Sequence, residues 1–438
     1  LASGATQTGF GRTGTVDWIT TPKVTGDSPV TGVTGKGYFL NTTAGTITLN
    51  LPAGAAGSIV SMADYAATWQ TNNVTVNANG TEKIGGVAST AVTLNTEGQS
   101  VTFVYVDSTQ GWVNTMDSTS NVRANAFIVA TGGTPSQCGD YEIRTFTGPG
   151  TFCVSATAAC AADNAVDYLV VAGGGGGGAG APASAYDAGG AGAGGYRESP
   201  GTANGSYTVS PLGVSPAAAI TVTASPYTIT VGGGGAGKTH PGATVAGANG
   251  DNSTFSSITS AGGGGGGSRN TPTTSPDAAW GQAGASGGGA GQADTCAQSQ
   301  RFGAGNTPPT TPAQGTPGGR SAFPVGSPSD SGGGGGGGAI CVGSNATSGN
   351  IGGNGGAGAT SSINGTPTIR AGGGGGAGTP ASGGQPGPGG GGTGSGPGQA
   401  TTAGGCNTGG GGGAGSGASC RSGGNGGSGV VIIRYKFQ

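Results

Sequence analysis

The sequence predicts an all-β protein in two parts: a small N-terminal sandwich or barrel, then a domain of packed polyglycine helices with short flanking strands. Three observations predict it. Short β-branched segments with alternating polarity recur between turn residues up to about residue 120. Glycine accounts for 107 of the 438 residues, where roughly 7% is usual. After residue 166 the glycines gather in uninterrupted runs, at 173–178, 232–235, 262–267, 332–338, 372–376, 389–392 and 409–413.

The charge content excludes several classes of protein. The net charge is −2 and 33% of the residues are hydrophobic, which argues against disorder caused by charge repulsion. The 15 Lys and Arg residues are scattered singly, so we expect no nucleic-acid partner. No apolar stretch reaches the roughly 20 residues that span a bilayer, so we expect no membrane insertion. The chain begins at Leu1 without an initiator Met, as a processed or truncated chain would.

Residues 1–120 are predicted to form the small β-domain. Thr46–Leu51 alternates with a period of two and stops at Pro52, and Asn73–Asn77 runs into the turn Asn79-Gly80. Three further segments have the same character, at 91–94, 101–106 and 111–114. Short β-branched strands at regular spacing with turn residues between them indicate a sandwich or a barrel.

Residues 121–165 are predicted to form a bridge made of a β-hairpin. The two strands expected are Tyr141–Phe146 and Thr151–Val154, which flank Gly148-Pro149-Gly150. A Gly-Pro-Gly turn between two alternating segments is typical of a hairpin.

Residues 166–438 contain the glycine runs, for which three interpretations compete. A nucleotide-binding loop needs a strand before it and a helix after it; Asp167–Val171 supplies the strand, but no helix follows. A flexible linker is the default for glycine. Against it, apolar strands lead into the runs or close the domain, and they need a core: Tyr227–Val231, Phe255–Thr259 and Gly429–Tyr435.

The third interpretation is a lattice of polyglycine II helices. Such helices have three residues per turn and rise about 3.1 Å per residue. Without side chains they can pack backbone to backbone, so that each N–H and C=O bonds a neighbouring helix. An inward Cβ would force the helices apart, so the runs must be nearly pure glycine. Ordering costs about 1–2 kcal/mol per residue, so only a cooperative bundle of several runs offsets it.

Two stretches of the chain resemble bacteriophage proteins. Residues 35–116 resemble small β-modules of phage tail fibres and tail-spike shafts, on the motif Thr48-Leu49-Asn50-Leu51-Pro52, the strand 72–76 and the strand Val101–Val106 before Gly111-Trp112-Val113. Such modules are often homotrimers. Residues 140–438 resemble the glycine-rich domain of many phage tail fibres, on motifs at 166–173, 193–198, 227–232, 253–258 and 429–435. More distantly, the layout is similar to the adhesins at the tips of T-even phage long tail fibres.

This resemblance implies a tail fibre of the virion, an extracellular adhesin whose loops bind a host-cell receptor, either an outer-membrane protein or a glycan. It also implies a homotrimer that assembles with other tail proteins. The alternative is a purely structural extracellular or virion fibre without a specific receptor, and a third hypothesis is a fibre-borne glycan hydrolase. We expect no enzyme, because the carboxylates after residue 166 are sparse and none pairs as in a glycosidase.

Candidate receptor contacts lie in the longest connections between runs, 179–231, 268–331 and 339–371. Aromatic residues and Arg contribute most at interfaces. The first choices are Trp280 and Phe302; the alternative is that they cover the lattice edge or fill gaps between glycine helices. The other candidates are Arg301, Phe323, Arg269, Tyr186 and His240.

The cysteines favour disulfides over a metal site. Seven cysteines without a Cys-x-x-Cys pair, with the single His240, do not fit a zinc site, and no cofactor is expected. Buried unpaired thiols are the alternative. The candidate disulfides are Cys138 with Cys153, Cys406 with Cys420, and Cys296 with Cys341.

Overall fold

The computed structural model describes residues 16–88, 91–118, 127–158, 160–180, 187–205, 207–239, 245–268, 280–292, 301–322, 332–347, 350–417 and 421–437. The chain divides into two compact units, Leu1–Ala124 and Asn125–Gln438. In the described residues the fold is all-β, with open sheets and two short 3-10 helices, η2 (Thr25–Asp27) and η3 (Ala161–Asn164). The predicted fold class is therefore confirmed.

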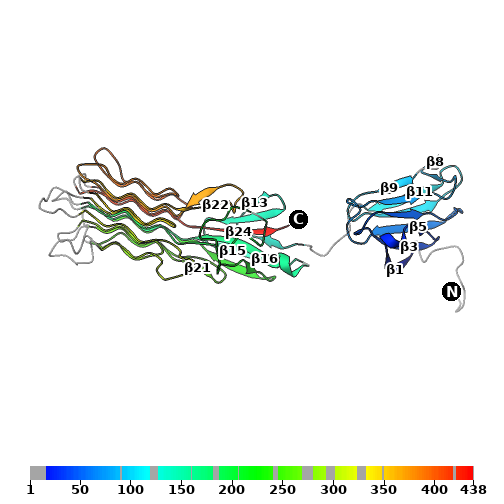
Figure 1. Ribbon diagram of the computed structural model, residues 1–438, viewed down its shortest axis with the longest axis horizontal. Helices are drawn as coiled ribbons and strands as arrows, with labels where there is room; N and C mark the ends of the chain where they lie inside the picture. The colour runs from blue at the N-terminus through cyan, green and yellow to red at the C-terminus, as the bar shows by residue number, and fades with distance from the viewer. Residues whose placement is uncertain are drawn as a thin grey trace. The chain divides into compact units, whose positions relative to one another are not determined.

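The first unit consists of two sheets, and its chain passes back and forth between them (Figure 1). From β1 to β6 successive strands fall in different sheets, so strands two apart in the chain become parallel neighbours. The parallel sets are β1 (Asp17–Val24), β3 (Lys36–Asn41) and β5 (Ile59–Asp64), facing β2 (Val30–Thr31), β4 (Ile47–Asn50) and β6 (Val74–Asn77). Shorter or antiparallel strands complete the sheets, namely β7 (Lys83–Ile84), β8 (Val87–Ala88), β9 (Ala91–Leu94), β10 (Ser100–Tyr105) and β11 (Trp112–Ser118).

Alternation along the strands places the core of this unit between its two sheets. In β4 the side chains of Ile47 and Leu49 are fully buried, whereas Thr48 and Asn50 between and after them are half-buried. The same pattern in β6 buries Val74. The two open sheets pack over Trp69, Trp112 and the aliphatic side chains, so of the two predicted alternatives, sandwich and barrel, the structure has the sandwich.

The second unit begins with two facing sheets. One has the order β12 (Val129–Thr131), β15 (Gly150–Ala156), β19 (Pro226–Thr230), β20 (Ser253–Phe255) and β21 (Ile258–Ser260). The other has the order β13 (Thr134–Cys138), β14 (Tyr141–Phe146), β24 (Val430–Lys436), β16 (Ala165–Val171) and β17 (Tyr196–Glu198), with β18 (Ile220–Thr221) beside β16. The strands β22 (Ala359–Ser361) and β23 (Thr368–Arg370) form a separate hairpin. Buried aromatic rings fill the space between the two larger sheets, with Phe152 in ring contact with Phe255 and Tyr435.

The predicted hairpin within residues 121–165 is wrong. β14 pairs with β13 and β24, whereas β15 pairs with β12 and β19. Phe146 and Phe152 both point into the core between the sheets. The segment around Gly148 therefore carries the chain from one sheet to the facing one, so that both strands bury their apolar side chains in one core. These strands belong to the second unit and are not a separate bridge.

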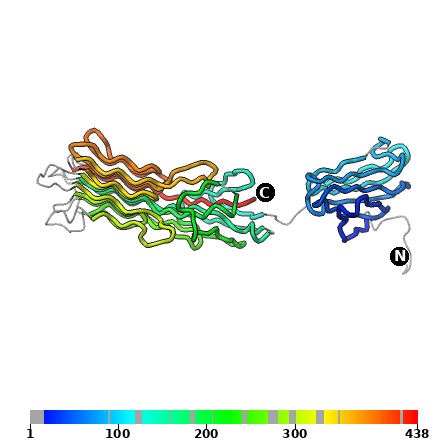
Figure 2. The backbone as a smooth tube through the Cα atoms, viewed as in Figure 1, coloured from blue at the N-terminus to red at the C-terminus, as the bar shows by residue number. Residues whose placement is uncertain are grey.

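Beyond the sheets, the glycine segments run side by side as a lattice (Figure 2). The segment 173–178 shows the pattern. Consecutive residues form backbone hydrogen bonds with different neighbouring segments, and residues three apart bond the same neighbouring segment. Its N–H groups donate to residues 251 and 248, 427 and 424, and 192 and 189, while its carbonyls accept from residues 263 and 266, 235 and 238, and 412 and 415. Six neighbours with a period of three is the geometry expected of packed polyglycine II helices.

Glycine is required in the lattice because neighbouring backbones occupy the space of a side chain. A Cβ on any residue of 173–178 would lie 1.9–2.3 Å from a carbonyl oxygen or other backbone atom of a neighbouring segment. The requirement for nearly pure glycine, predicted from the sequence, does not hold at every position. Ala188, Ala191 and Ala193 are also fully buried among the glycine segments. The lattice therefore accepts a methyl group at selected positions.

Asparagine side chains cap the edges of the lattice. A peripheral segment has N–H groups that no further segment can reach, and an Asn Oδ1 from the adjacent pass accepts from them at 2.8–2.9 Å. The pairs are Asn425 with Gly237, Asn252 with Gly262, Asn249 with Gly265, Asn345 with Arg320, and Asn354 with Gln385. The amide oxygen takes the place of a missing neighbour's carbonyl.

Buried tyrosines predict that the second unit loses stability at alkaline pH. Burial raises the pKa of Tyr435 to about 12, with the Glu142 carboxylate beside it adding to the rise, and burial raises the pKa of Tyr196 and Tyr207 further. Above pH 10 the unfolded chain releases phenol protons that the folded chain retains. The free energy of unfolding should then fall by about 1.4 kcal/mol per pH unit for each tyrosine.

This slope can be measured by thermal unfolding between pH 9 and 11.5. The substitution Tyr435→Phe should reduce the slope of the free energy of unfolding against pH by about 1.4 kcal/mol per pH unit, because phenylalanine has no phenol proton to release. An unchanged slope in Tyr435→Phe would contradict the assignment.

Candidate functional site

The lattice has an outer end, away from the sheets, where its segments reverse direction (Figure 1). There, Ala179 donates its N–H to Ser268 Oγ at 3.0 Å. Asp187 and Gln292 bond each other, through Asp187 N–H to Gln292 Oε1 at 3.3 Å and Gln292 N–H to the Asp187 carbonyl at 2.9 Å. The described residues that flank segments 181–186, 269–279 and 293–300 therefore meet at this end.

Near the outer end, four adjacent passes of the chain place aromatic and basic side chains in one strip. We call it the edge strip and define it as Trp280, Arg301, Phe302, Arg320 and Asn345. Backbone bonds hold the passes in register, from Gly281 to the Arg301 carbonyl, from Gly318 to the Gly303 carbonyl, and from Ala346 to the Arg320 carbonyl. Residues far apart in the sequence are thus fixed next to one another by a scaffold that needs no side chains.

The first pair in the edge strip is Arg301 on Trp280. The guanidinium carbon lies 3.8 Å from the centroid of the indole ring, which is a close cation–π contact. Gln282 Nε2 donates to the Trp280 carbonyl at 3.1 Å, so the backbone of this residue is held. The indole Nε1–H is buried and has no hydrogen-bond partner in the described part of the chain. Arg301 itself is exposed, so its remaining N–H donors face solvent.

The second pair is Arg320 over Phe302, with 5.9 Å between the guanidinium carbon and the ring centroid. The Arg320 side chain is exposed, but its backbone is held by two hydrogen bonds. Its N–H donates to Asn345 Oδ1 at 2.8 Å, and its carbonyl accepts from the Ala346 N–H. A large apolar side chain is also exposed on the adjoining pass, where Ile351 is 43% exposed. The strip therefore combines apolar area with charged donors.

This arrangement suits binding more than catalysis. Aromatic rings and Arg are the side chains that most often carry binding energy, and a rigid backbone reduces the entropy lost on association. The guanidinium groups can donate to carboxylate, phosphate or hydroxyl oxygens. Within the described residues, no three His, Cys, Asp or Glu side chains gather as a metal site. The same residues contain no helix long and apolar enough to cross a membrane.

Comparison with protein families agrees with the lattice architecture. Residues 145–436 match the family described as a glycine-rich domain. The chain belongs to this glycine-rich domain family. A comparison with curated proteins finds no significant match. The matched range starts in β14 and ends in β24, so the glycine-rich domain comprises the sheets as well as the lattice.

The structure brings together three of the side chains singled out from the sequence of the glycine-rich domain. Trp280, Arg301 and Phe302 lie in the edge strip, where they are half-buried or exposed. The strip also contains Arg320 and Asn345, which the sequence analysis did not select. Asn345 could have been found by asking which Asn residues follow a lattice segment at its edge. The other candidates, Tyr186, His240, Arg269 and Phe323, lie outside the described residues.

The connections that contain these residues are not loops throughout. The segments 280–292 and 301–322 of the glycine-rich domain are lattice passes, although Ala, Ser, Gln and Pro interrupt their glycines. In these passes residues 282–283 and 301–302 are exposed or half-buried, so a side chain can project there, whereas residues 284–292 are buried among their neighbours.

The disulfide predicted between Cys138 and Cys153 is not formed, because β13 and β15 lie in different sheets and both thiols are free. The thiols of Cys160, Cys341 and Cys406 are also free. The proposed partners Cys296 and Cys420 lie outside the described residues.

Proposed function

We propose that this glycine-rich domain protein is an adhesin of the phage tail-fibre type, which binds a host cell-surface receptor through the outer end of its lattice. The observation that supports the proposal is the edge strip. Two arginines over aromatic rings, beside the exposed side chain of Ile351, form the kind of surface that contributes strongly to binding. The glycine lattice supplies the rigidity that such a contact needs.

We further propose that the first unit mediates attachment as a homotrimer. Large apolar side chains on its surface support this, with Met116 at 61%, Val87 at 57% and Tyr65 at 56% exposure. A second and third copy would remove such side chains from water. Under this proposal the protein is extracellular, part of the virion and not an enzyme. Its mass in solution, measured by light scattering, distinguishes a trimer from a monomer.

The adhesin proposal is tested by binding of the fluorescently labelled chain to a panel of intact bacterial strains. On a strain that the wild-type chain binds, the double variant Trp280→Ala/Arg301→Ala should bind at least about tenfold more weakly, since hot-spot truncations cost 2 kcal/mol or more. The lattice should remain folded, because both side chains lie at its edge.

The matched control removes a similar pair at the opposite end of the same unit. Lys436, the last residue of β24, has its Nζ 4.8 Å from the Phe127 ring centroid. The variant Phe127→Ala/Lys436→Ala should bind cells as the wild type does. Equal loss in both variants, or undiminished binding after the edge-strip substitutions, would contradict the assignment. Binding to no strain would favour a purely structural fibre.

A further inference from the structure

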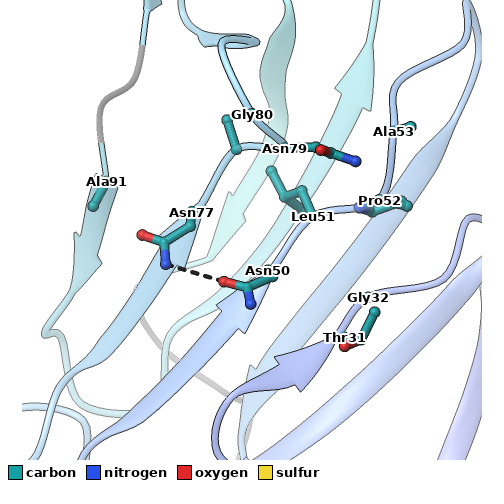
Figure 3. Close-up of a pocket in the computed structure, with 11 residues that line it drawn as sticks. Thr31, Gly32, Asn50, Leu51, Pro52, Ala53, Asn77, Asn79, Gly80 and Ala91 are labelled. Atoms are coloured by element: carbon teal, nitrogen blue, oxygen red, sulfur yellow. Dashed lines mark hydrogen bonds between the residues drawn. The ribbon is translucent and has the colours of Figure 1, made fainter.

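The first unit contains a trough that the proposed function does not use. It crosses the ends of β2, β4 and β6 and the start of β9, and its volume is about 760 Å³ (Figure 3). This is within the 300–1,000 Å³ typical of small-molecule sites. Among the described residues that line it, none is charged and none is aromatic. Its recognition chemistry therefore consists of amides, hydroxyls and backbone groups beside apolar side chains.

Two asparagines at matching positions on parallel strands form the polar centre of the trough. Asn50 ends β4 and Asn77 ends β6, and the two are register partners. Asn77 Nδ2 donates to Asn50 Oδ1 at 3.0 Å. Their outward direction follows from the alternation that buries Leu49 and Val76 on the opposite side of the same strands. The sequence pattern thus sets the pair at the surface.

This amide pair is only partly satisfied. The backbone bonds around it are made, since Leu51 N–H donates to the Asn77 carbonyl at 2.8 Å and Gly32 N–H donates to the Asn50 carbonyl at 2.7 Å. In the described part of the chain, however, Asn50 Nδ2 and Asn77 Oδ1 have no hydrogen-bond partner. Figure 3 shows this nitrogen and this oxygen turned away from the bond that joins the two amides. A donor and an acceptor are therefore presented together at fixed positions.

We propose that the trough binds a neutral saccharide. A sugar hydroxyl both donates and accepts, so two neighbouring hydroxyls can accept from Asn50 Nδ2 and donate to Asn77 Oδ1. Thr31 and Asn79, exposed on either side, offer further hydroxyl and amide groups. Pro52, half-buried, and Ala53, exposed, supply apolar contact for the C–H face of a sugar ring. The lack of lining charge gives no preference for an anionic or cationic ligand.

The site is independent of the edge strip, so its test does not depend on the adhesin proposal. The full chain is examined by saturation-transfer difference NMR with glucose, galactose, mannose and N-acetylglucosamine, each titrated into the millimolar range. Glucuronate and an uncharged tetrapeptide serve as comparison probes. At least one neutral sugar should give saturable transfer, and the double variant Asn50→Ala/Asn77→Ala should weaken it at least tenfold.

Two further variants separate loss of the site from loss of the fold. Asn114→Ala removes an exposed amide from β11 in the other sheet and should bind sugar as the wild type does. Ala53→Arg leaves both amides in place and fills the trough from its exposed rim, so it should abolish binding. Thermal unfolding verifies that each variant is folded.

The proposal is overturned if no neutral sugar binds, or if Ala53→Arg and the double asparagine variant bind as the wild type does. Preferential binding of the tetrapeptide would make the trough a peptide site. A change in oligomeric state in Asn50→Ala/Asn77→Ala, with no sugar binding by the wild type, would identify the trough as a contact between copies of the chain.

Discussion

The substitution Gly176→Ala should destabilise the glycine-rich domain by about 3 kcal/mol or more, because it places a methyl group in the centre of the lattice. A Cβ at this position would lie 2.1 Å from the Ala236 carbonyl oxygen. The same residue donates to the Ala248 carbonyl at 2.8 Å and accepts from Gly266 at 2.9 Å. Relieving the clash therefore requires three neighbouring segments to move apart. Urea or thermal unfolding of the full chain measures the effect.

Gly233 provides a matched control in another glycine run. It is exposed, and the atom nearest to an added Cβ is Asp251 Oδ2 at 3.3 Å, which belongs to a side chain that can move. Gly233→Ala should be neutral or stabilise by up to about 1 kcal/mol, because it restricts only the unfolded chain. If both substitutions had equal effects, backbone packing would not be the reason for the glycine runs.

The substitution Arg434→Leu should destabilise the same unit by about 3 kcal/mol, since it removes a buried guanidinium from its hydrogen-bonded carbonyls and from the strand position opposite a buried carboxylate. Arg434 is 4% exposed, donates to the Asn204 carbonyl at 3.0 Å, and has its guanidinium 4.6 Å from the Tyr141 ring centroid. Its strand partner Asp167 is fully buried and accepts from Ser199 Oγ at 2.8 Å. Loss of the arginine leaves this carboxylate without a neighbouring positive charge from β24.

A double-mutant cycle tests this explanation. Asp167→Asn in the Arg434→Leu background should restore part of the lost stability, because it removes the uncompensated charge. Arg197→Leu is the control on the neighbouring strand; its guanidinium makes one exposed bond of 3.5 Å to the Thr259 carbonyl, so the change should stay within about 0.5 kcal/mol. Strict additivity of Asp167→Asn and Arg434→Leu would show that the two groups do not interact.

Local patterns were sufficient to predict the elements of this protein. Period-two alternation in 47–50 and 74–77 gave strands with one buried face, because side chains of a strand alternate between its two sides. The uninterrupted glycine runs gave the lattice, since only residues without a Cβ can pack with their backbones in contact. The choice of Trp280, Arg301 and Phe302 also rested on residue type alone.

Pairing between distant segments could not be predicted in this way. The strands on either side of Gly148 have the local pattern of a hairpin, yet they join facing sheets, because partners from residues 226–230 and 430–436 compete for their edges. The same reason explains the unformed disulfide and the missed Asn345, which caps the N–H of Arg320 across the lattice edge. The sequence by itself determined which segments are strands and which are glycine helices, since both depend on side-chain size and polarity along the chain. Only the tertiary structure decided which segments are neighbours, because that depends on how all of them fill the same space.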